Sequence, residues 1–168
     1  MQQSKTIRKL GYGLVSLMLA LTFALVGCTA QGTPVTEEQS ANRQYMSQVN
    51  NIMDELQARL DSFDAAVARG DVVTMKTQAD NAFKTLDRLS TLDVPDALKE
   101  VQDDYVNGTN SLKDALTAQI ALYTEIESAT SEHPFDYGTY DSRLQEIQDK
   151  YDAGISSLQA ADEKAASL

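Results

Sequence analysis

The side chains with the greatest capacity for chemistry are few, and one group of them surrounds the single histidine. Glu132, His133 and Asp136 lie close together in the sequence. Imidazole and carboxylate groups are common ligands of divalent cations, so these three residues are a candidate metal site. Their spacing matches neither an EF-hand loop nor a His-Glu-x-x-His helix. A solvated acidic loop that holds no metal is the alternative interpretation.

The groups needed for covalent catalysis are not assembled anywhere along the chain. No serine lies in a Gly-x-Ser-x-Gly sequence, and His133 is the only imidazole available as a base. One cysteine and one histidine do not make the usual zinc sets. The acidic residues fall on the polar sides of expected helices, which argues against a glycosidase-type carboxylate pair. We therefore expect no enzymatic activity and no cofactor.

The only cysteine, Cys28, lies directly after a segment typical of protein export. A short basic head is followed by an apolar run from Leu10 to Val26, the pattern of an export signal. The run ends in Leu25-Val26-Gly27-Cys28. This sequence resembles the lipobox of bacterial lipoproteins, in which a small residue precedes the cysteine whose thiol receives the lipid. An uncleaved membrane anchor with an ordinary buried thiol is the alternative.

The resemblance implies cleavage between Gly27 and Cys28, with residues 1–27 as a signal peptide. Residues 28–36 (CTAQGTPVT) would then form a lipidated, flexible tether. Cleavage removes three of the 14 basic residues and none of the 25 acidic ones, which changes the net charge from −11 to −14. The expected location is extracytoplasmic, with the membrane as a partner through Cys28. So acidic a chain is not expected to bind nucleic acid.

Two segments of fifteen residues share a pattern that includes a glycine in the middle of a helix. Residues 98–112 (LKEVQDDYVNGTNSL) and 144–158 (LQEIQDKYDAGISSL) have identical residues at eight positions. A glycine inside a helix costs about 1 kcal/mol relative to alanine, so its recurrence requires a reason. Tyr105 with Gly108 and Tyr151 with Gly154 are either close-packing notches, where a neighbouring helix or a ring from a facing helix comes near the backbone, or a matched pair of ligand notches.

Apolar residues recur every three or four positions throughout the rest of the chain, which indicates amphipathic helices. We expect helices over 36–69, 72–90, 95–128 and 139–166. Thr36 and Gln39 form a capping-box pattern, and Gly70 is placed to end the first helix. Gln119 is the one polar residue on the apolar stripe of the third helix. Phe135, Tyr137 and Tyr140 cluster at the third corner, as core residues or as a partner-binding patch.

These features predict an all-α fold after the signal peptide. Short corners between long helices favour an elongated, antiparallel up-down-up-down four-helix bundle over residues 37–168. The expected function is that of a membrane-anchored extracytoplasmic lipoprotein, a non-enzymatic interaction or structural module with a partner protein of the cell envelope. The alternative is a ligand-binding lipoprotein that holds a divalent metal or a small molecule between the third and fourth helices.

Overall fold

The computed structural model describes residues 36–167, and over this range the chain forms four long helices and no strand. The all-α prediction is therefore confirmed for these residues. Gly27, Cys28 and the tether before Thr36 lie outside them. The helices are α2 (Glu37–Arg69), α3 (Val72–Ser90), α4 (Lys99–Ser128) and α5 (Tyr140–Ala166), with short 3-10 turns η1 (Asp96–Leu98) and η2 (Tyr137–Thr139).

Local hydrogen bonds and one glycine explain where α2 begins and ends and where α3 begins. The Thr36 hydroxyl accepts a hydrogen bond from the Gln39 backbone N–H, and the Gln39 side chain accepts one from the Thr36 N–H. This is the predicted capping box. Gly70 ends α2 with a φ of 65°, a left-handed conformation that glycine adopts without strain. Asp71 then caps α3 by accepting from the Thr74 N–H at 3.0 Å.

The third helix begins four residues later than predicted, at Lys99 instead of Pro95, whereas the fourth begins at Tyr140, one residue after its predicted start. Pro95 has an extended backbone with a ψ of 146°, and the η1 turn intervenes before α4 starts at Lys99. The η2 turn similarly precedes α5, where the Asp136 side chain accepts from the Gly138 N–H at 2.9 Å. Both differences are at helix starts, where a side-chain cap or a proline competes with the first α-helical turn.

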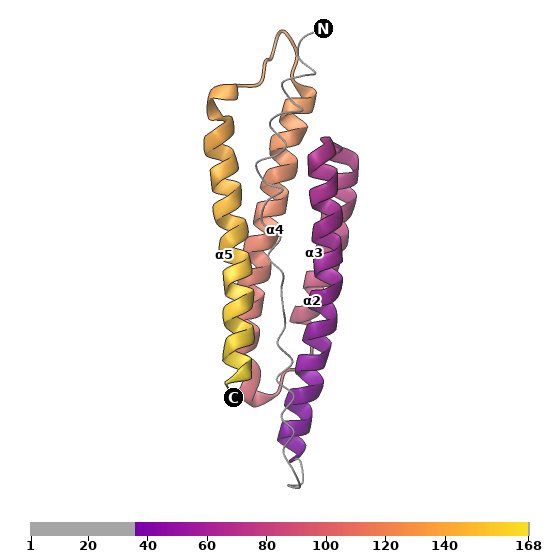
Figure 1. Ribbon diagram of the computed structural model, residues 1–168, viewed down its shortest axis with the longest axis vertical. Helices are drawn as coiled ribbons and strands as arrows, with labels where there is room; N and C mark the ends of the chain where they lie inside the picture. The colour runs from indigo at the N-terminus through magenta and orange to yellow at the C-terminus, as the bar shows by residue number, and fades with distance from the viewer. Residues whose placement is uncertain (1–35, 168) are drawn as a thin grey trace.

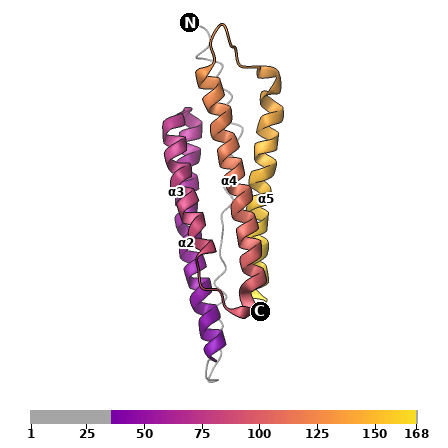
Figure 2. The same ribbon diagram turned by 180° about the vertical axis from the view of Figure 1, so that it is seen from behind.

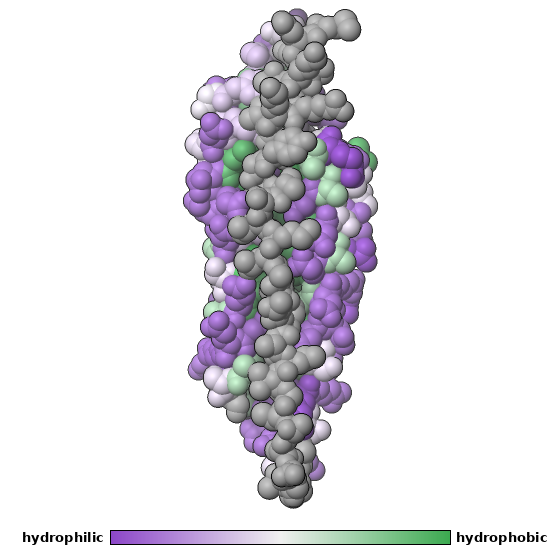
Figure 3. All heavy atoms as spheres, viewed as in Figure 1, coloured by the Kyte–Doolittle hydropathy of each residue, from purple (hydrophilic) through white to green (hydrophobic). Residues whose placement is uncertain are grey.

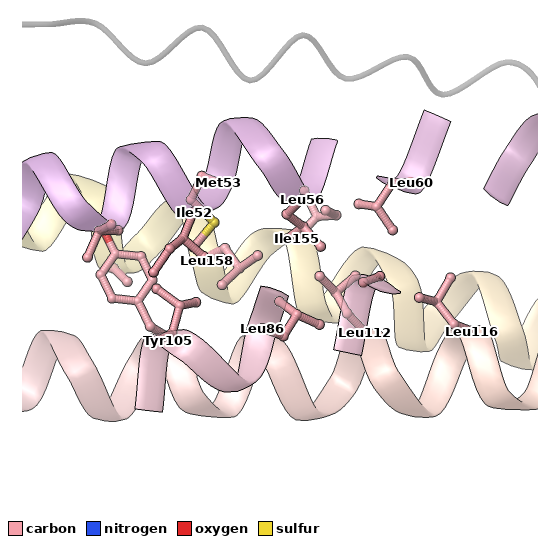
Figure 4. Packing of buried hydrophobic residues seen from close by; sticks show 14 of the residues in the cluster. Ile52, Met53, Leu56, Leu60, Leu86, Tyr105, Leu112, Leu116, Ile155 and Leu158 are labelled. Carbon is pink, nitrogen blue, oxygen red and sulfur yellow. The ribbon is translucent and has the colours of Figure 1, made fainter. Parts of the chain in front are cut away.

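Each helix lies beside the one that precedes it in the sequence and runs in the opposite direction (Figures 1 and 2). The most extensive pairing is between α4 and α5, followed by α2 with α3 and then α3 with α4. The inner sides of all four helices share one apolar core (Figure 4). In the view of Figure 3, hydrophilic residues predominate on the outer sides of the helices.

A second, smaller apolar cluster lies at the corner between α4 and α5. Phe135 and Tyr140 are buried there, with their rings edge to face at 6.4 Å between centroids. Tyr137 is 56% exposed, and its ring lies edge to face with that of Phe135 at 4.9 Å between centroids. Two of the three aromatic residues thus pack as core, and the third is exposed alone rather than as part of an aromatic patch.

Candidate functional site

The two repeated glycines lie where α4 and α5 are in close contact. A Cβ atom on Gly108 would be 2.9 Å from Leu158 Cδ2 and 3.0 Å from the Gly154 carbonyl oxygen. A Cβ atom on Gly154 would be 2.8 Å from Leu112 Cγ. Each glycine is therefore in contact with the leucine at the end of the other repeat. The space beside both glycines is filled by leucine rather than by an aromatic ring, which supports the packing interpretation.

These contacts relate α4 and α5 by an approximate two-fold exchange of the repeats. Gly154 follows Gly108 by 46 positions, and Leu158 follows Leu112 by the same number. Exchanging the repeats converts the Gly108–Leu158 contact into the Gly154–Leu112 contact. The glycine contacts thus place the two repeat tyrosines at corresponding corners of the helix pair, which we name the Tyr105 corner and the Tyr151 corner.

At the Tyr105 corner, buried polar groups are paired with one another across all four helices. The Tyr105 hydroxyl donates to the Asp162 carboxylate of α5. Gln102 accepts from the Tyr45 hydroxyl of α2 and donates to the Leu89 carbonyl oxygen of α3 at 2.6 Å. Burial raises the pKa of Asp162, an effect that the hydrogen bond from Tyr105 partly opposes. This corner is closed, because these buried groups have their partners.

At the Tyr151 corner, the corresponding partners are missing. The counterpart of Asp162, 46 positions earlier, is Leu116, which has no polar atom to offer Tyr151. A pocket of about 40 Å³ lies here between α2, α4 and α5. Its lining consists of Phe63, Asp64, Val67, Ala115, Leu116, Gln119, Ile147, Gln148 and Tyr151. The same register that closes one corner therefore leaves a hollow at the other.

Gln119 is the most unusual residue of this pocket. Its exposed fraction is 3%, and neither its amide oxygen nor its amide nitrogen has a hydrogen-bond partner among residues 36–167. A buried amide without partners loses its hydrogen bonds to water and gains none in the protein, which lowers the stability of the folded state by about 1–3 kcal/mol. Its counterpart at the closed corner is Ala165, whose side chain has no polar atom that needs a hydrogen-bond partner. One lining residue of the pocket thus has an amide donor and an amide acceptor without hydrogen-bond partners.

The rim of the pocket is acidic. Desolvation by neighbouring atoms and, to a lesser extent, repulsion from Asp61 raise the pKa of Asp64 to about 6, although the residue as a whole is exposed to solvent. Burial also raises the pKa of Tyr151 to about 12, and the nearby Asp64, Asp61 and Asp152 add to this. Asp64 forms no ion pair within the described part of the chain. Its negative charge is therefore uncompensated at neutral pH.

The predicted metal ligands lie elsewhere, in the loop that joins α4 to η2. Glu132, His133 and Asp136 are all exposed. The Asp136 carboxylate accepts from the Gly138 N–H. Within residues 36–167, no three His, Cys, Asp or Glu side chains are grouped so that they could hold a metal ion.

The sequence pointed to part of the Tyr151 corner. Tyr151 was a candidate residue, and Gln119 was conspicuous as a polar residue on an apolar stripe. Asp64 and Gln148 were missed, since each lies on the polar side of its own helix. Gln148 carried one signal: it is the repeat counterpart of Gln102, which is buried and hydrogen-bonded at the closed corner.

The close approach at the repeated glycines predicts the effect of adding a methyl group. Gly154→Ala should destabilise the protein by about 1–2 kcal/mol, because overpacking against Leu112 outweighs the gain in helix propensity of about 1 kcal/mol. Urea denaturation of the full chain measures this change. In a Leu112→Ala background the same substitution should cost less. Stabilisation by Gly154→Ala alone would contradict the close contact.

The raised pKa of Asp64 predicts a dependence of stability on pH. Because the folded-state pKa of about 6 lies above the ordinary value of 3.8, the folded state loses stability as the pH rises from about 4 to about 6, and the full loss is present above about 6. Asp64→Asn should therefore be more stable than the parent by about 1 kcal/mol at about pH 8, allowing for solvent screening, with no gain at about pH 4. Denaturation at both pH values measures this, with Asp54→Asn as a control on the exposed side of α2. An equal effect at the two pH values would contradict the assignment.

Comparison with known proteins supplies no function for this site. No protein-family profile, curated protein or solved structure matches the chain. What the chain does must therefore be inferred from its own residues and their geometry.

Proposed function

We propose that the chain is a lipid-anchored extracytoplasmic lipoprotein whose helical body acts as a non-enzymatic interaction or structural module of the cell envelope. The observation that carries this proposal is Leu25-Val26-Gly27-Cys28 after a basic head and an apolar run. The thiol of Cys28 would receive the lipid, and Cys28 would become the first residue of the mature chain. None of the helices in residues 36–167 has the length and apolar character needed to cross a bilayer.

The body that the anchor would hold is an elongated, antiparallel up-down-up-down four-helix bundle. The opposite directions of consecutive helices in Figure 1 support this arrangement. The 33 residues of α2 correspond to a rod of about 50 Å at 1.5 Å per residue. A tether of residues 28–36 would join the lipid to the end of the bundle where α2 begins. The connections from α2 to α3 and from α4 to α5 would then face away from the membrane.

The charge of the mature chain favours a body that stands away from the lipid surface. With a net charge of −14 after cleavage, the body is repelled by anionic headgroups. Attachment would then depend on the acyl chains, at about 0.8 kcal/mol per buried CH₂ group. The helices present mainly hydrophilic residues in the view of Figure 3. Together with the negative net charge of the chain, this suits a protein partner that carries basic groups.

Ligand binding between the helices is a second candidate function. The observation that favours it is the buried, unpartnered amide of Gln119 beside Tyr151. Both functions are compatible in one molecule, because the pocket and the anchor use different residues.

The lipid anchor predicts a specific result for replacement of the thiol. The native product should begin at Cys28 and carry a diacylglyceryl group, and it should partition into the detergent phase. Cys28→Ser should retain residues 1–27 and carry no lipid, because a hydroxyl does not replace the thiol as lipid acceptor. Mass spectrometry of the intact protein from envelope extracts measures both.

A second variant controls for the mere presence of a thiol. Ser16→Cys in the Cys28→Ser background restores a cysteine within the apolar run but not after Gly27. It should remain unprocessed and without lipid. A parent protein with Cys28 bare and the leader attached would refute the proposal.

A further inference from the structure

We propose that the pocket at the Tyr151 corner binds a small ligand of the amino-alcohol class, in which a primary ammonium group neighbours a hydroxyl group. The site is built from Asp64 of α2, Gln119 of α4 and Tyr151 of α5. The proposal does not depend on the lipid anchor, and it concerns a different place from the two glycine notches.

The closed corner shows what the open corner lacks. In the closed corner, a carboxylate accepts the tyrosine hydrogen bond and a buried glutamine amide has both a donor and an acceptor as partners. In the open corner, a carboxylate, a tyrosine and a buried glutamine amide are again present, but they come from Asp64, Tyr151 and Gln119. No hydrogen bond joins any of these three side chains to another residue of the described chain. A ligand can therefore supply the missing partners.

The chemistry of the three groups selects the ligand. An ammonium group has three donors, which suit the Asp64 carboxylate and the Tyr151 oxygen. A hydroxyl both donates and accepts, as the two unpaired atoms of the Gln119 amide require. The carboxylate of Asp64, with Asp61 one turn away on α2, disfavours an anion. The apolar walls of Phe63, Leu116 and Ile147 suit the carbon stem.

The size of the pocket limits the ligand to a few atoms. A water molecule needs about 10–15 Å³ of such space, so a pocket of about 40 Å³ accommodates roughly three groups of that size. This matches 2-aminoethanol with its ammonium at the rim. For so small a ligand we expect a dissociation constant in the millimolar range.

Nuclear magnetic resonance titration of the full-length chain in detergent tests the proposal. The side-chain amide signal of Gln119, assigned by its absence in Gln119→Leu, should shift on addition of 2-aminoethanol. n-Propylammonium, which lacks the hydroxyl, should bind about fivefold more weakly. n-Propanol and propionate should bind at least about tenfold more weakly. No shift with 2-aminoethanol, or equal shifts with n-propanol, would overturn the proposal and leave a pocket that holds water only.

Two variants separate the pocket from general charge attraction. Asp64→Asn should weaken binding at least about tenfold, because it removes the charged acceptor. Asp54→Asn removes the same charge from an exposed residue of α2 that does not line the pocket, and it should change binding less than about twofold. Equal losses in the two variants would indicate non-specific attraction of a cation and overturn the site. Tetramethylammonium, which has no N–H donor, should produce no saturable shift.

The dependence of binding on pH provides a further check. Affinity should be constant from about pH 8 to about pH 7 and fall as the pH is lowered through about 6, where Asp64 gains a proton. Among the titratable groups around Asp64, Asp61 on α2 raises the pKa of Asp64, and on α5 the pKa of Tyr151 is itself raised by Asp64 and by Asp152. The pocket residues of α4 contain no titratable group. Affinity that is constant down to about pH 4 would contradict the role of Asp64.

Discussion

The contact between the two repeat glycines and the two repeat leucines fixes the register of α4 against α5. With glycine at both positions, the helices approach until Leu158 lies on Gly108 and Leu112 lies on Gly154. Each glycine costs about 1 kcal/mol of helix stability relative to alanine, and the buried leucine side chains offset this cost. A shift of one helix by a turn would place leucine against a side chain instead. The most extensive pairing of the bundle therefore has one favourable register.

This register determines where the polar groups of the core meet. It brings Tyr105 to Asp162 at one corner and Tyr151 to Leu116 at the other. The backbone arrangement is thus shared by the two corners, whereas their side chains differ. One corner became a hydrogen-bonded joint of four helices, through Tyr45, Leu89 and Gln102. The other retains a pocket with an acidic rim, and we infer that this difference is functional.

Most of the fold was predictable because its determinants are local in sequence. The capping box at Thr36, the left-handed Gly70 and the spacing of the apolar residues act within a few residues. The start of α2 and the C-terminal ends of all four helices therefore agree with the prediction. The start of α4 was less predictable, since Pro95 has an extended backbone and a 3-10 turn precedes the α-helix there. The signal peptide, the tether and the lipid on Cys28 remain predictions from the sequence.

The candidate site was predictable only in part, because its geometry depends on which helices face each other. The repeat identifies Gly108 and Gly154 as unusual, but which side chains contact them depends on the register between two helices. These side chains are Leu158 and Leu112. Gln119 was visible as a polar residue on an apolar stripe. Asp64 was not, since nothing in the local sequence indicates that one carboxylate among many lies at the rim of a pocket.

The most direct test of the difference between the two corners is the rate at which the Gln102 and Gln119 side-chain amide protons exchange with water. Nuclear magnetic resonance of the full-length chain without ligand measures both rates in one sample. We predict slow exchange for Gln102, whose amide donates to Leu89 in the closed corner, and much faster exchange for Gln119, whose amide has no hydrogen-bond partner and belongs to a residue that lines the open pocket. Equally slow exchange at the two residues would show that Gln119 is already paired within the protein, and the distinction between a closed and an open corner would be wrong.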